Sequence, residues 1–132
     1  MAVITGLSHI GIFVKDIKKS QQFYQDILGF KTTWECEFSD AANTYTIAII
    51  ANGSVVIELV QKKVQTPLRD GVTDHVAMAV DDLDGIIKEL SGKGIQFETS
   101  EPVYEAKMLK NGSKWIFFRG PDNEHIELAQ AL

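Results

Sequence analysis

Two histidines and two glutamates stand at matching places in the two halves of the chain, and their side chains are well suited to chemistry. His9 and His75 are 66 residues apart (75 − 9) in a chain of 132, and each opens an alternating apolar run. Glu58 and Glu127 are 69 residues apart (127 − 58), and each is the centre of an Ile-Glu-Leu tripeptide. Imidazole and carboxylate groups together bind divalent ions such as Zn²⁺, Ni²⁺, Co²⁺ and Fe²⁺. The spacing indicates a duplicated module that builds a metal site.

A single His or Glu in a strand has an ordinary explanation. A lone strand His is usually a surface residue or a satisfied core residue, and a lone Glu usually lies at a sheet edge. A pair repeated in register is different, because a buried carboxylate needs a charge partner and a metal ion supplies one. We therefore interpret the four residues as ligands of one divalent ion that keeps room for water or substrate.

The elements that position these residues also repeat, because each half shows a strand, a helix and three further strands. In the first half the predicted elements are strand 7–14, helix 17–28 and strands 30–38, 44–51 and 54–60. In the second half they are strand 73–80, helix 83–93 and strands 95–99, 115–119 and 124–129, with 103–109 as either a strand or an irregular segment. Each half is thus predicted to be a βαβββ module.

Strand alternation predicts where the four side chains point. The aliphatic residues that flank each His and Glu point the opposite way and must meet the apolar stripe of the helix. The His and Glu side chains then share the other, concave face. The predicted class is α+β, with two tandem βαβββ modules (about 5–62 and 72–131) forming a curved, partly open mixed sheet around a concave metal site. We expect a single domain over 1–132.

Composition argues against several classes of function. The formal net charge is −5 and no Lys/Arg-rich run occurs, which disfavours binding to nucleic acid or to anionic membranes. No basic, apolar leader and no apolar stretch of about 18 residues is visible, so we expect neither signal peptide nor membrane span, and a cytoplasmic location. Cys36 is the only cysteine, so no intrachain disulfide can form, and we expect it to be a buried or half-buried filler.

These motifs resemble the vicinal oxygen chelate superfamily, which includes glyoxalase I, extradiol dioxygenases, methylmalonyl-CoA epimerase, and fosfomycin- and bleomycin-resistance proteins. The segments that carry the resemblance are residues 8–14, 23–30, 56–59, 74–77 and 118–128. The order His, Glu, His, Glu is most similar to glyoxalase I (lactoylglutathione lyase). The resemblance implies that His9, Glu58, His75 and Glu127 hold a divalent metal, with nickel, cobalt and zinc all open.

The resemblance further implies a metal-dependent lyase or isomerase. It would convert the hemithioacetal of a 2-oxoaldehyde to a 2-hydroxyacyl thioester through a metal-stabilised enediolate, with Glu127 shuttling the proton and Glu58 sharing that role. Two alternatives stay open: an epimerase or other lyase acting on a non-thiol substrate, and a small-molecule binding or antibiotic-resistance protein. A homodimer is expected, with the site either within one chain or across two copies.

Two positions depart from the glutathione-dependent pattern. Members of that type usually carry an Arg four residues after the first ligand and an Asn four residues after the first Glu. Here those positions are Phe13, which cannot hold an anion, and Lys62. We therefore expect a small-molecule substrate whose thiol is not specified. Phe13, His125 and Trp115 are expected to line its pocket, although His125 can also be read as a partly exposed strand-end residue.

Overall fold

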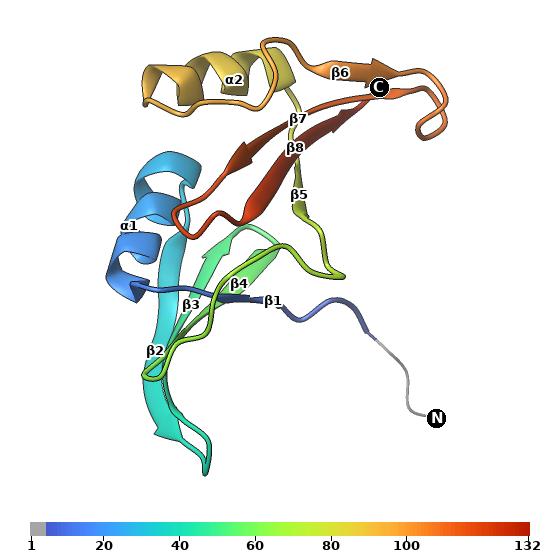
Figure 1. The fold of residues 1–132 in the computed structure, drawn as a ribbon. Coiled ribbons are helices and arrows are strands. Elements are labelled where there is room, and N and C mark those ends of the chain that lie inside the picture. Colours follow the sequence, from blue (N-terminus) through green and yellow to red (C-terminus); the bar gives the residue numbers. More distant parts are fainter. Residues whose placement is uncertain (1–4) are drawn as a thin grey trace. The chain divides into compact units, whose positions relative to one another are not determined.

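The structure is a computed structural model that describes residues 5–132, and its chain forms two compact units, Met1–Leu68 and Arg69–Leu132 (Figure 1). The first unit contains β1 (Ile10–Phe13), α1 (Ile17–Leu28), β2 (Lys31–Ser39), β3 (Thr44–Asn52) and β4 (Val55–Lys62). The second contains β5 (Val76–Ala79), α2 (Leu83–Gly92), β6 (Val103–Glu105), β7 (Ser113–Arg119) and β8 (His125–Ala131). The α+β class and the repeated βαβββ order are confirmed.

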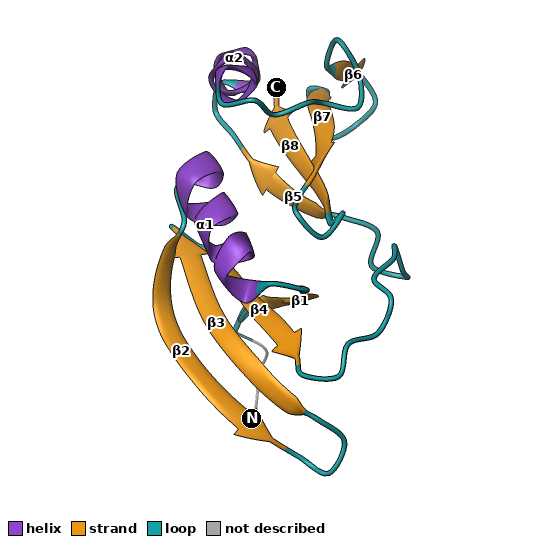
Figure 2. Ribbon diagram, turned by 60° about the vertical axis from the view of Figure 1, so that its left-hand side comes forward, coloured by secondary structure: helices purple, strands orange, loops and turns teal. Residues whose placement is uncertain are grey.

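The first unit is a four-stranded mixed sheet in the order β1-β4-β3-β2, with β1 parallel to β4 and the other pairs antiparallel. Helix α1 lies along one face of this sheet and contacts β2, β3 and β4 (Figure 2). Its buried side, which includes Ile17 and Tyr24, packs with Ile57 and Leu59, both fully buried. The aliphatic neighbours of Glu58 therefore point into the core, as the alternation predicts.

The second unit repeats this plan in the order β5-β8-β7-β6, with β5 parallel to β8. Leu83 and Leu90 of α2 are buried, and so are Ile126 and Leu128 on β8. Glu127 lies between the last two and faces the opposite side of the sheet.

The helix starts show that the duplication extends beyond the sheets. Asp16 and Asp82 are the N-caps of α1 and α2, and the side chain of each accepts a hydrogen bond from a backbone N–H three residues on. The last strand of each unit holds the helix as well. Gln61 accepts the N–H of Ile17 at 2.7 Å, and Gln130 accepts the N–H of Leu83 at 2.9 Å. These ties fix each helix to the strand that carries the Glu.

One predicted strand is wrong. Residues 95–99 make only a single bridge, between Phe97 and Phe118, and the edge of the second sheet is the short β6. The segment turns away because the Thr99 hydroxyl donates to the Glu101 carbonyl at 2.7 Å, which bends the backbone before Pro102. The carboxyl of Glu98 is turned toward β7 and β8 instead, as described below.

The expectation for Cys36 is also wrong, because its side chain is exposed. It lies on β2, the edge strand of the first sheet, along which all nine residues are exposed. Among the described residues, neither helix is long and apolar enough to cross a membrane.

Candidate metal centre

The register of the two parallel strand pairs is the same in both units. Gly11 of β1 lies opposite Glu58 of β4, and Ala77 of β5 lies opposite Glu127 of β8. Each His stands two residues before that small residue and so shares its face. Because a glycine and an alanine offer little or no side chain there, each carboxylate has a clear approach to the imidazole of its own unit.

This register brings one His and one Glu together in each unit. Nε2 of His9 lies 3.7 Å from Oε2 of Glu58, and Nε2 of His75 lies 2.9 Å from Oε2 of Glu127. Two ligand atoms each about 2.0–2.2 Å from one ion are about 3.0 Å apart at an octahedral angle and about 3.4 Å apart at a tetrahedral angle. The His75–Glu127 separation matches the octahedral value, whereas the His9–Glu58 separation is about 0.3 Å longer than the tetrahedral value and needs a small side-chain shift to hold the same kind of ion.

Each unit brings two such ligands and not more. Over residues 5–132, no group of three or more His, Cys, Asp or Glu side chains is arranged to hold an ion by itself. The structure therefore joins His9 with Glu58 and His75 with Glu127, while the union of the two pairs around one ion stays a prediction.

The remaining ring nitrogen of each His is held by the residue before it. Ser8 Oγ is 3.0 Å from His9 Nδ1, and Asp74 Oδ2 is 2.9 Å from His75 Nδ1. A carboxylate can only accept, so Nδ1 of His75 donates to Asp74. The same hydrogen bond holds the pKa of Asp74 below its ordinary value. With Nδ1 held in this way, Nε2 of His75 faces Glu127 and is the ring nitrogen that would bind a metal ion.

Two aromatic side chains of β7 share the face of the second pair. Phe117 lies opposite Glu127, and its ring meets that of His75 edge-on at 5.3 Å. It also lies 4.3 Å from the ring of His125. Trp115 follows the same alternation and lies opposite Ala129. Phe117 was not among the residues that the sequence singled out for the pocket, so its contact with His75 was missed. Its alternation with Trp115 was the available signal.

His125 lies beside His75, with ring centroids 6.2 Å apart, but it also contacts two acidic side chains. Its Nε2 is 3.1 Å from Oε1 of Glu98, and its Nδ1 is 3.5 Å from Oδ2 of Asp74. With only 12% of its side chain exposed, His125 is not a loose strand-end residue.

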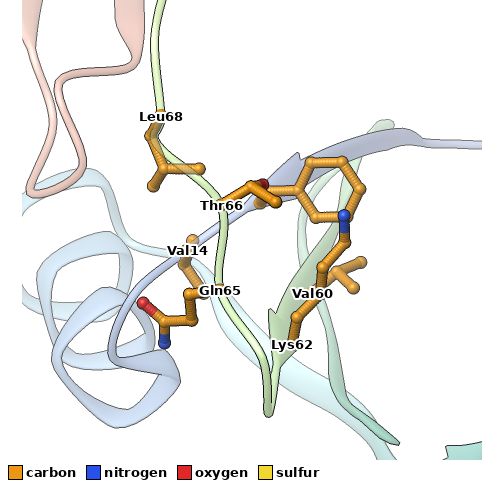
Figure 3. A pocket seen from close by; sticks show the side chains of 7 residues that line it. Val14, Val60, Lys62, Gln65, Thr66 and Leu68 are labelled. Carbon is orange, nitrogen blue, oxygen red and sulfur yellow. The ribbon is translucent and has the colours of Figure 1, made fainter. Parts of the chain in front are cut away.

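In the first unit, Phe13 and Lys62 meet. Nζ of Lys62 lies 4.1 Å from the ring centroid of Phe13, a cation–π contact. The contact lies at a small hollow on the first unit (Figure 3), lined by Phe13, Val14, Val60, Lys62, Gln65, Thr66 and Leu68. Lys62 is four residues beyond Glu58 on β4 and shares its strand face, roughly 13 Å further along at about 3.3 Å per residue. The charge of Lys62 thus lies over the ring of Phe13, at the position where the glutathione-dependent pattern has an Arg.

The family model of the Glyoxalase/Bleomycin resistance protein/Dioxygenase superfamily matches residues 6–128, which is most of the chain. The chain belongs to this superfamily. The vicinal oxygen chelate resemblance drawn from the two His motifs is therefore confirmed.

Superfamily relatives match the chain over nearly its whole length. Uncharacterized protein YwkD of Bacillus subtilis is 32% identical over 130 residues, covering 96% of this chain and 97% of the relative. A probable lactoylglutathione lyase of Synechocystis is 31% identical and covers 94% of each chain.

Solved structures share the fold of this chain. A structure from the mobile metagenome of V. Pseudocholerae gives a TM-score of 0.73 at 22% identity, covering 100% of this chain and 98% of that one. The fosfomycin resistance protein FosX of Listeria monocytogenes, complexed with Mn(II) and sulfate, gives 0.66 at 21% identity, covering 98% and 95%.

Proposed function

We propose that the protein is a metal-dependent enzyme of the glyoxalase I type, which isomerises the hemithioacetal of a 2-oxoaldehyde to a 2-hydroxyacyl thioester. The observation that supports this most is the His–Glu pair at the same register in both units, with separations suited to neighbouring ligands of one ion. The probable lactoylglutathione lyase of Synechocystis, 31% identical over nearly the full length, points to the same chemistry.

In this proposal His9, Glu58, His75 and Glu127 hold one divalent ion, which is nickel, cobalt, zinc or, as with FosX, manganese. The two pairs come either from one chain or from two copies in a homodimer. When bound, the ion supplies Lewis acidity to adjacent oxygens of the substrate.

The two carboxylates then move the proton. Glu127 takes a proton from the carbon that bears sulfur and returns it to the neighbouring carbonyl carbon, and Glu58 shares this role. Carboxylates suit the task because proton transfer needs a base within hydrogen-bond reach of the reacting carbon. Side-chain exposures of 14% for Glu127 and 30% for Glu58 keep most water away while leaving both groups accessible to substrate.

The aromatic and cationic side chains near the pairs would hold the rest of the substrate. Phe13, Trp115 and His125 supply apolar and polar lining, as predicted from the sequence. Lys62 adds a positive charge over Phe13, which suits a thiol carrying an anionic group. A thiol other than glutathione fits this arrangement, because the charge comes from β4 and not from position 13.

The test is metal analysis of the purified protein, followed by an assay with methylglyoxal and a series of thiols after loading with each metal. We expect thioester formation with at least one metal and thiol. Glu127→Gln and Glu58→Gln should each lower kcat by about 10²-fold or more with the fold intact. Full activity in both metal-bound variants, or no product from any metal–thiol pair, would overturn the proposal.

A second candidate is a resistance function, because three of the similar folds are FosX structures from Listeria, one of them with Mn(II). Loss of fosfomycin in the presence of Mn(II), with no turnover of methylglyoxal, would favour it. Racemisation of a non-thiol substrate would favour an epimerase instead.

A further inference from the structure

The His9–Glu58 pair and the His75–Glu127 pair are called here the first and the second half-site. The two half-sites share a backbone register but differ in the side chains around the His and the Glu. The residue before the His is Ser8 in the first unit and Asp74 in the second. The residue two before the Glu is Val56 in the first unit and His125 in the second. The second half-site therefore carries a carboxylate and an imidazole where the first has a hydroxyl and an aliphatic side chain.

The two half-sites also differ in the distance between the His and the Glu and in the exposure of the Glu side chain. His75 and Glu127 are 2.9 Å apart, whereas His9 and Glu58 are 3.7 Å apart. The Glu127 side chain is also less exposed than that of Glu58, 14% against 30%. The second pair is the closer and the better enclosed.

A series of polar contacts runs from Asp74 toward β7 and β8. Oδ2 of Asp74 lies 3.5 Å from Nδ1 of His125, an ion-pair distance without a hydrogen bond, and His125 contacts Glu98 at 3.1 Å. Glu98 in turn accepts from Nε of Arg119 at 3.1 Å. Arg119 also donates two hydrogen bonds, of 2.7 and 3.2 Å, to the carboxylate of Asp70. Asp70 lies four residues before Asp74 in the chain. The segment that carries Asp74 and His75 is thus tied to β7 and β8, all within the second unit.

The first half-site has no comparable tie among the described residues. Residues 5–9 are exposed, and the contact that orients the ring of His9 is the single one from Ser8. A hydroxyl can rotate and either donate or accept, so Ser8 permits both tautomers of His9. The carboxylate of Asp74 can only accept, so it keeps a proton on Nδ1 of His75 and fixes the ring through that nitrogen.

We infer that Asp74 is a positioning residue that makes the His75–Glu127 pair the anchoring half of the metal site, on which the ion first settles. This inference rests on the metal-dependent function proposed above. Its physical basis is that a carboxylate on the far nitrogen of a His ligand fixes the ring and strengthens its metal bond, an effect of about 10- to 100-fold in affinity.

The first test needs no metal. Nitrogen-15 NMR of the imidazole rings in the metal-free protein should show a proton on Nδ1 of His75, and His9 as a mixture of tautomers. Asp74→Ser, which copies the first half-site, should turn His75 to a mixture, and Asp74→Glu, which keeps a carboxylate, should largely restore the proton on Nδ1. Asp74 is exposed enough, at 63% of its side chain, for these variants to fold. An Nε2–H form of His75 in the wild type, or one unchanged by Asp74→Ser, would overturn the inference.

The second test is a titration with Co²⁺ or Mn²⁺, followed by absorption or electron spin resonance. Asp74→Ser should weaken metal binding about 10- to 100-fold, whereas Ser8→Ala, the matched control in the first unit, should weaken it only a few-fold. Equal losses in the two variants would contradict the anchoring role. Tight metal binding without glyoxalase turnover would instead refute the proposed function and leave this inference standing.

Discussion

The buried carboxyl of Glu124 is expected to make the protein less stable at alkaline pH. Glu124 ends the turn before β8, where both side-chain oxygens are shielded from solvent and lack a well-formed hydrogen bond among the described residues. Burial first, and the nearby charge of Asp122 second, raise the pKa of Glu124 to about 7. The backbone N–H groups of residues 122 and 124 offset only part of this rise. The carboxyl lies against the backbone of Gly120, where an added side chain would displace it.

The sign follows from proton linkage. Because the pKa is raised in the folded state above its ordinary value of 4.5, the folded protein binds more protons than the unfolded chain between about pH 4.5 and 7. Stability is then fully present below about pH 4.5 and falls as pH rises through 7. A difference of about 2.5 units at about 1.36 kcal/mol per unit sets a ceiling near 3.4 kcal/mol, and relaxation around the turn reduces it to about 2–3 kcal/mol.

Glu124→Gln removes this penalty without changing the shape of the side chain. We expect the variant to be about 2–3 kcal/mol more stable than wild type at pH 8 and nearly equal at pH 4.5. The assay is urea unfolding at several pH values, with the slope m checked for constancy. Glu37→Gln, at an exposed position on β2, is the control and should leave the pH profile unchanged. Parallel pH profiles for wild type and Glu124→Gln would refute the reasoning.

Three further predictions concern the candidate site. Lys62→Met should raise KM about tenfold for a substrate with an anionic thiol and leave kcat nearly unchanged, as initial rates at varied thiol would show; an equal fall in kcat would place Lys62 in the chemistry instead. Gly11→Val should put a branched side chain in the approach of Glu58 to His9 and weaken metal binding by tenfold or more, measured by metal titration, with Tm almost unmoved; unaltered binding would mean that this approach is not used. Removal of metal by a chelator should abolish turnover while circular dichroism stays native, because each unit has its own core, and re-addition of metal should restore the rate.

The His–Glu pairing within each half-site could be predicted from the sequence because it depends on the alternation of side chains along single strands. Period-two alternation puts His9 and His75 on one face of their strands and the flanking aliphatics on the other, and the repeated Ile-Glu-Leu does the same for Glu58 and Glu127. Pairing of the first strand with the last in each unit then needs only the βαβββ order. The same period-two rule failed at 95–99, because the direction of that segment depends on a local turn and on contacts of Glu98 with β7 and β8.

The difference between the half-sites has another origin. Both units use the same register, Gly11 opposite Glu58 and Ala77 opposite Glu127, so the backbone does not account for His–Glu separations of 3.7 and 2.9 Å. What differs is the group on Nδ1 and the contacts that hold that group. The hydroxyl of Ser8 can orient in either sense, whereas the carboxylate of Asp74 is held through His125 and Glu98 to an Arg. Duplication therefore accounts for the places of the four proposed ligands, and we infer that substitutions one and two residues away change how firmly each pair would hold an ion.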